Sequence, residues 1–149
     1  GPGKAKAAGL PSYADIGRQA ITGNEDDRYR FRTPSLRMVS LTGPYGHSGA
    51  YGSLEAVIRH HSDPILSLMT YDRQEALLPK VNLGDDWGAM EDQDELINIA
   101  AAIELPAQPL DTKKISELVA FLEALTDTRA AKGRLGVPSQ VPSGLAIDR

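Results

Sequence analysis

The chain contains no cysteine among its 149 residues. This absence excludes disulfides, thiolate metal sites and a haem attached covalently to this chain, since each of these needs a cysteine sulfur. The net charge of −4 argues against general nucleic-acid binding, because attraction to phosphate needs a basic surface. No apolar run approaches the length of a membrane span. The ordinary sequence signals of a metal or redox centre are therefore missing.

What is present is typical of a globular protein. Hydrophobic residues make up 41% of the chain and charged residues 24%. The length fits one domain, so we predict a single domain over residues 1–149. Ten prolines and fourteen glycines predict extensive loops. Runs of alternating β-branched residues are scarce, which favours a mostly α fold with long loops.

Two helices are predicted in the first half of the chain. One covers residues 13–20, with Ser12 as its cap and Gly23 after its end. The other follows Ser53, a natural N-cap, and ends at Asp63-Pro64. The segment between them, rich in charge, proline and glycine, is predicted to be loop.

Two further helices are predicted in the second half. One lies within residues 91–105, where acids at its start suit the helix dipole. The stronger one lies within 110–127 and is capped by Asp111 or Thr112. Its apolar residues are expected to form one stripe (Ile115, Leu118, Val119, Leu122 and Leu125). Residues 133–149, with two Val-Pro-Ser units, are expected to be an extended tail.

Adjacent histidines end the helix that starts after Ser53. His61 continues the apolar spacing of Leu54 and Ile58, whereas His60 is about 100° away, toward the polar side. An inward His61 has two interpretations: a core histidine bonded to a carbonyl or carboxylate, which is the commoner case, or a metal ligand such as an axial ligand of haem iron. His60 is expected to be solvated or bonded to a loop carbonyl.

Other candidate residues precede this helix. His47 lies between glycines, where a ligand can approach the backbone closely, although a turn hydrogen bond is the simpler interpretation. Arg32 and Arg37 flank a Thr-Pro-Ser turn and can hold either a haem propionate or a carboxylate. Trp87 is interpreted as a side chain packed in the core or, alternatively, as an intermediate site for electron transfer.

Four pieces of the sequence, in this order, resemble a known family. They are "LPSYADIGRQAITG", "FRTPSLRMVSLTGPYGHSGAYGSLEAVIRHH", "LDTKKISELVAFLEALTD" and "VPSGLAID". Together they are similar to the C-terminal haem domain of the bacterial di-haem cytochrome c peroxidases, a superfamily that includes the methylamine-utilisation haem enzyme that completes a tryptophan-derived quinone cofactor. The resemblance implies a cytochrome c-like fold. Residues 69–103 have no good counterpart and are expected to be an insertion.

The resemblance also implies roles for individual residues. A threonine and the proline two positions later, here Thr42 and Pro44, lend backbone carbonyls to a calcium ion. Nineteen residues after that threonine stands the sixth ligand of the haem, methionine or tyrosine in the family; here it is His61. His60 is the alternative if the helix is shifted by one residue. Arg37 and His47 are expected at the haem pocket.

The chain departs from the family at its haem attachment. The expected Cys-x-x-Cys-His motif is missing, as are the N-terminal haem domain and the tryptophan that bridges the two haems. The resemblance therefore implies a C-terminal part of a periplasmic oxidoreductase, inactive as this chain alone. Its haem c is carried by cysteines outside this chain, peroxide reacts at the other haem, and a further protein is the electron donor or substrate. The alternative is a haem-free interaction module that kept the scaffold.

Overall fold

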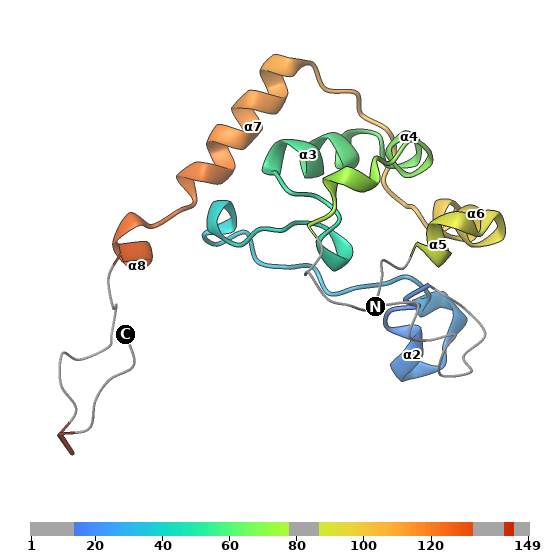
Figure 1. The fold of residues 1–149 in the computed structure, drawn as a ribbon, viewed down its shortest axis with the longest axis horizontal. Helices are drawn as coiled ribbons and strands as arrows, with labels where there is room; N and C mark the ends of the chain where they lie inside the picture. Colours follow the sequence, from blue (N-terminus) through green and yellow to red (C-terminus); the bar gives the residue numbers. More distant parts are fainter. Residues whose placement is uncertain (1–13, 78–86, 133–141, 145–149) are drawn as a thin grey trace.

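Short helices and turns make up the fold. The computed structural model describes residues 14–77, 87–132 and 142–144. Figure 1 shows the helices α2 (Gln19–Thr22), α3 (Leu54–Ser62), α4 (Pro64–Met69), α5 (Gly88–Glu91), α6 (Gln93–Ala101), α7 (Thr112–Ala124) and α8 (Thr128–Lys132). Four 3-10 turns accompany them: η1 (Glu25–Asp27), η2 (Val39–Leu41), η3 (His47–Gly49) and η4 (Arg73–Glu75).

The mostly α prediction is confirmed. Across the described ranges, β structure is limited to two isolated bridges, and no described helix has the length and hydrophobicity of a transmembrane span. The predicted extended tail lies outside the described residues except for 142–144.

Two capping side chains define α3 and α4. The Ser53 hydroxyl accepts a hydrogen bond from the Ala56 N–H at 3.1 Å, as the sequence predicts for an N-cap. Asp63 ends α3 and accepts a bond from the Leu66 N–H at 3.1 Å, so the same residue starts α4. Pro64 suits the first position of α4, where no intrahelical N–H bond is needed. A single residue therefore joins the two helices.

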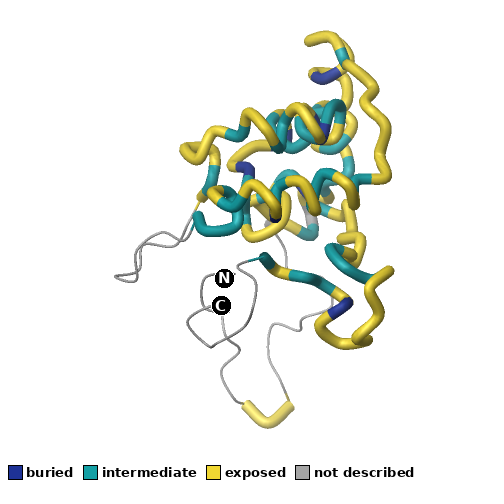
Figure 2. Tube along the Cα trace, turned by 90° about the vertical axis from the view of Figure 1, so that its right-hand side faces the viewer, coloured by how far each residue is buried: buried dark blue, intermediate teal, exposed yellow. Residues whose placement is uncertain are grey.

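The core lies where α3 packs against α4 and α7. Figure 1 shows α7 passing beside α3. The buried apolar side chains are Val39, Tyr51, Leu54, Ile58 and Ile115. Figure 2 shows how few of the described residues are buried. Large apolar side chains are exposed on α4 and α7, among them Leu66 and Phe121.

The predicted stripe of α7 is only partly covered. Asp111 caps the helix by accepting from the Lys114 N–H at 2.8 Å, which decides between the two expected caps. Ile115 is 2% exposed and Leu118 is 40% exposed, so the apolar stripe is buried at Ile115 and open to solvent at Leu118. Helix α7 contacts α3 and η2.

The first predicted helix is shorter than expected. Helix α2 begins at Gln19, whereas residues 14–18 are not helical, and Ser12 and Tyr13 lie outside the described residues. The chain before α2 instead bonds to a later segment: the Arg18 N–H donates to the Arg30 carbonyl at 2.9 Å. Gly23 ends the helix as predicted, in the left-handed region at φ 69°.

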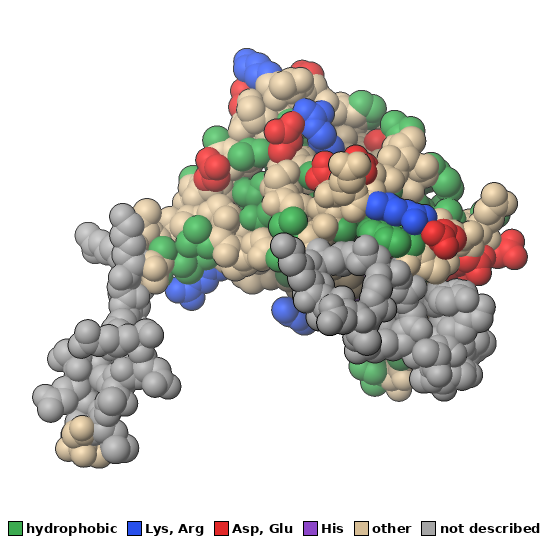
Figure 3. Space-filling model, viewed as in Figure 1, with side chains coloured by type: hydrophobic (Ala, Val, Ile, Leu, Met, Phe, Trp, Pro, Cys, Tyr) green, Lys and Arg blue, Asp and Glu red, His purple; other side chains and the backbone are tan. Residues whose placement is uncertain are grey.

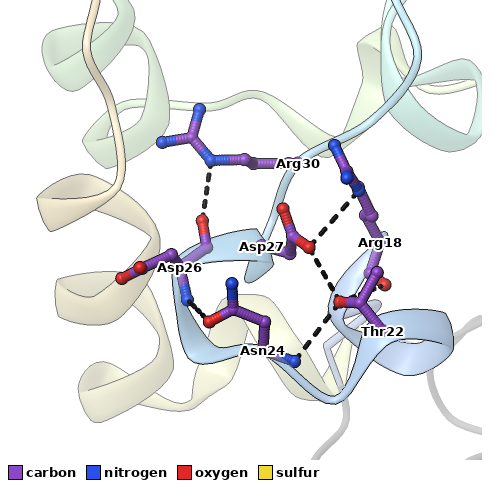
Figure 4. Close-up of polar contacts among 6 residues, drawn as sticks. All are labelled: Arg18, Thr22, Asn24, Asp26, Asp27 and Arg30. Carbon is purple, nitrogen blue, oxygen red and sulfur yellow. Dashed lines mark hydrogen bonds and ion pairs between the residues drawn. The ribbon is translucent and has the colours of Figure 1, made fainter.

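Polar side chains hold α2 against η1. Figure 4 shows Asp27 between Thr22, which donates to it at 2.8 Å, and Arg18, whose Nε lies 3.3 Å away. Asn24 caps η1 by accepting from the Asp26 N–H. This network fixes the turn that leads into Arg28 and Tyr29.

The described part of the predicted insertion is packed against the rest of the domain. Helix α6 contacts α4, and Glu95 of α6 bonds to Arg28 and Tyr29 far away in the sequence. Within the region itself, Arg73 pairs with Glu91 at 3.0 Å. That residues 69–103 are an insertion relative to the family stays a prediction, as does the single domain.

Candidate functional site

The two histidines at the end of α3 have opposite surroundings to those predicted. His61 is exposed, whereas His60 is half-buried, with its Nδ1 3.0 Å from Ser67 Oγ and its ring 5.1 Å from that of Tyr51. The expectation of an inward His61 and an outward His60 is therefore wrong. The cause is the tight connection at Asp63, which turns α4 back along the His60 side of α3 and brings Ser67 against it.

The His61 ring is oriented by its own helix. Its Nδ1 lies 2.8 Å from the Val57 carbonyl oxygen, and because a carbonyl only accepts, Nδ1 carries the proton. In the neutral ring the lone pair is then on Nε2, which has no hydrogen-bond partner within the described residues. Metal-ligating histidines typically show this arrangement, with one ring N–H held by a carbonyl and the other nitrogen directed at the metal. His61 therefore fits an axial ligand of iron.

His60 is held inside the α3–α4 corner. Burial, and then the neighbouring His61, lower the pKa of His60, so its ring is neutral near pH 7. Contacts with Ser67 and Tyr51 fix the ring in place. As an alternative iron ligand, His60 is less accessible than His61.

Thr42 and Pro44 lie in the exposed loop between η2 and η3. In the described part of the chain, neither carbonyl accepts a hydrogen bond, so both oxygens are available to a cation. Calcium takes roughly six to eight oxygen ligands, so these two make only part of a site. The described residues contain no cluster of three or more histidines and carboxylates that would complete it. The loop is tied to the start of α3 because Tyr45 and Tyr51 exchange backbone bonds of 2.8 and 3.0 Å.

The two predicted pocket residues, Arg37 and His47, have different contacts. The exposed guanidinium of Arg37 has no partner among the described residues, which leaves it available to an anion. His47 Nε2 lies 3.3 Å from Asp15, and the His47 ring is 4.2 Å from Phe31. His47 therefore contacts the segment before α2 and not the end of α3.

A groove that the sequence did not predict lies between η1, the segment after it and the end of α6. It has a volume of about 1590 Å³, and its walls include Arg28, Tyr29, Arg30, Phe31, Ala101 and Glu104. Of the residues predicted to hold haem or a cation, Arg32 alone lines this groove, whereas His61, His60, Thr42 and Pro44 do not. It is therefore separate from the iron-ligand candidate.

A buried carboxylate supports one side of this groove. Glu95 is 7% exposed, accepts a hydrogen bond from the Tyr29 hydroxyl and lies 3.5 Å from the Arg28 guanidinium. Burial, and then the bond to Glu95, raise the pKa of Tyr29. Sequence reasoning missed this cluster, since Glu95 is 66 residues from Tyr29 and 67 from Arg28, and no spacing rule connects them.

Comparison with known proteins identifies relatives over most of the chain. The chain is 34% identical over 128 residues to the methylamine utilization protein MauG of Paracoccus denitrificans, a match that covers 83% of this chain and 30% of that protein. It is 59% identical over 58 residues to MauG of Methylorubrum extorquens, covering 36% of this chain and 16% of that protein. No protein-family model and no solved structure matches the chain.

Peroxidases match over a shorter segment. The chain is 48% identical over 42 residues to cytochrome c551 peroxidase of Nitrosomonas europaea, covering 28% of this chain and 13% of that protein. The chain thus spans less than a third of the length of these relatives. The predicted resemblance is confirmed: the chain is homologous to part of the MauG and cytochrome c peroxidase proteins of the di-haem superfamily.

Proposed function

We propose that this chain is the C-terminal part of a di-haem peroxidase-type oxidoreductase and that His61 is the axial ligand of the haem iron in this part. The observation that carries the proposal is the geometry of His61, whose Nδ1–H is held by Val57 while Nε2 stays accessible at the surface. The position of His61, nineteen residues after Thr42, supports the same role. The two arguments are independent, since one uses the fold and the other the resemblance.

The haem must be carried by another segment or chain, because this sequence has no cysteine. The surface of the domain supports such a contact. Three large apolar side chains, Leu36, Leu41 and Phe121, are 51%, 59% and 56% exposed. Exposed apolar side chains that gather on a surface mark contacts with other protein parts or with apolar ligands. Figure 3 shows hydrophobic side chains reaching one face of the molecule between charged ones.

When bound, the haem supplies one-electron redox chemistry. His61 would complete a bis-histidine pair with the proximal histidine of the haem-carrying segment. Replacing a thioether ligand by an imidazole lowers the reduction potential. Two protein ligands leave no open position for peroxide, so peroxide would react at the second haem and this half would transfer electrons.

The remaining predicted residues would support the cofactors. Arg37 would bind a propionate, since its guanidinium is exposed and suits planar recognition of a carboxylate. Thr42 and Pro44 would offer their carbonyls to calcium at the boundary with the partner segment. His47 would steady the loop before α3 through Asp15 and Phe31. The proposed location is the periplasm, with a further protein as electron donor or substrate.

A haem-free interaction module is the second candidate, and the complete lack of cysteine favours it. A visible spectrum and intact masses of everything that co-purifies with the chain decide between the two. Our proposal predicts a Soret band that stays with the assembly and a second polypeptide whose mass includes covalent haem. A colourless assembly would contradict it and support the interaction module.

A further inference from the structure

Five aromatic rings form a continuous series that begins at the proposed iron ligand. The ring centroids of His61 and His60 are 5.4 Å apart, those of His60 and Tyr51 5.1 Å, and those of Tyr51 and Tyr71 5.7 Å. Tyr71 and Trp87 follow at 6.4 Å. Each separation lies in the range of direct aromatic contact, roughly 4.5–7 Å. The series therefore leads from the end of α3 to the indole that precedes α5.

The two tyrosines are fixed within the fold. The Tyr51 ring is 8% exposed, and its hydroxyl lies 3.2 Å from Ser67 Oγ. The Tyr71 hydroxyl donates to the Ala50 carbonyl at 2.5 Å. Burial raises the pKa of both tyrosines, so both phenols keep their protons near neutral pH. The two phenol rings therefore stay in fixed positions between His60 and Trp87.

We propose that Trp87 is a one-electron redox site, connected to the end of α3 through the rings of Tyr71, Tyr51 and His60. The inference rests on the proposed function for its natural oxidant, which is the oxidised haem iron at His61. Trp87 gives up one electron and the iron gains it. The bridging rings are unchanged at the end of the transfer. A one-electron donor outside this chain, together with a proton from water, then restores Trp87.

The surroundings of Trp87 decide where its proton goes. The Arg73 guanidinium lies over the indole, 5.1 Å from the ring centroid, and opposes positive charge there. Arg73 is itself paired with Glu91 at 3.0 Å, which weakens that opposition. Trp87 is half-buried and its N–H has no hydrogen-bond partner among the described residues. After oxidation the indole N–H proton passes to water, and a neutral radical remains.

A photochemical experiment tests this route without haem. A ruthenium polypyridyl complex is coordinated to the exposed Nε2 of His61 in the full chain, with His47→Gln to remove the other exposed histidine, and the labelled position is checked by peptide mapping. A flash in the presence of a soluble quencher makes Ru(III), and transient absorption follows the radical. We expect a tryptophan radical that forms as Ru(III) is reduced and that is lost in Trp87→Phe.

Two substitutions at the middle of the series test the bridge. Tyr71→Phe keeps the ring and is expected to keep the rate, whereas Tyr71→Leu should slow Ru(III) reduction and lose most of the radical. Phe121→Leu removes an exposed ring outside the series and should change nothing. No tryptophan radical in the labelled wild-type chain, or equal rates in Tyr71→Leu and Tyr71→Phe, would overturn the proposal. If circular dichroism shows that Tyr71→Leu unfolds, the rate of Ru(III) reduction still decides: it should be slower in Trp87→Phe than in the labelled wild type, and equal rates would overturn the proposal.

The same experiment keeps the two proposals apart. Because ruthenium replaces haem, failure of the haem assignment leaves the radical unaffected. Conversely, if no electron transfer from Trp87 through the rings is observed, the spectrum and the iron ligation predicted for the haem assembly are unaffected.

Discussion

Single residues at the end of α3 carry the chemistry that we propose for this chain. His61 directs one ring nitrogen at its own helix and leaves the other at the surface, while its neighbour His60 is enclosed by α4. Spacing along the chain predicted the candidate ligand but not its surroundings. Helix phase gives only the angle between two side chains, and which side is covered depends on the turn at Asp63.

The pH dependence of stability follows from His60. In the folded chain, burial and then the neighbouring His61 lower the pKa of His60 below its ordinary value of 6.5. As the pH falls, His60 therefore takes up a proton in the unfolded chain before it does so in the folded chain. The free energy of unfolding should therefore fall as pH drops below about 6.5, until the pH is below the folded pKa. In His60→Gln this contribution should be absent, as measured by urea denaturation at pH 7 and pH 5. Equal losses in both proteins would show that His60 does not contribute.

Helix α3 shows how local sequence defines an element. Both ends of the helix were predicted correctly from Ser53, Asp63 and Pro64, because capping depends on residues that are neighbours in the sequence. The helix expected over residues 13–20 begins at Gln19 instead, for the opposite reason. Tertiary bonding of Arg18 to Arg30, beyond the reach of local propensity, holds that segment in another conformation.

Loss of the α3 cap should destabilise the protein measurably. Ser53→Ala removes the acceptor of the Ala56 N–H and is expected to lower the free energy of unfolding by about 1 kcal/mol. The matched change Ser116→Ala, within α7, should be neutral or stabilising, since alanine is the better helix former in a helix interior. Urea denaturation of both variants checks this. A larger loss in Ser116→Ala than in Ser53→Ala would refute the assignment of the cap.

At the scale of the whole molecule, the described residues build a small core and a large apolar surface. Pattern analysis predicted the mostly α class because helix-forming spacing is local. It could not predict how α5 and α6 dock, since contacts such as Tyr29 with Glu95 join distant segments. It predicted the apolar stripe on α7 but not that Leu118 is exposed, because hydrophobicity alone does not show which side of a helix is covered.

The docking of α6 should depend on its buried carboxylate. Glu95→Ala leaves the Tyr29 hydroxyl and the Arg28 guanidinium without their acceptor and should lower the free energy of unfolding by about 1–3 kcal/mol. Glu104→Ala removes an exposed carboxylate that bonds to Arg30 at 2.6 Å and should leave stability unchanged. Equal effects of the two substitutions in denaturant titrations would contradict the packing described for α6.

The reduction potential of the haem assembly tests the central claim most directly. A thioether in place of imidazole raises the potential of haem iron. With His61 as ligand, His61→Met should raise the measured potential and alter the low-spin spectrum, while His60→Met should leave both close to the wild type. An unchanged potential in His61→Met, or a shift that follows His60→Met instead, would contradict the account.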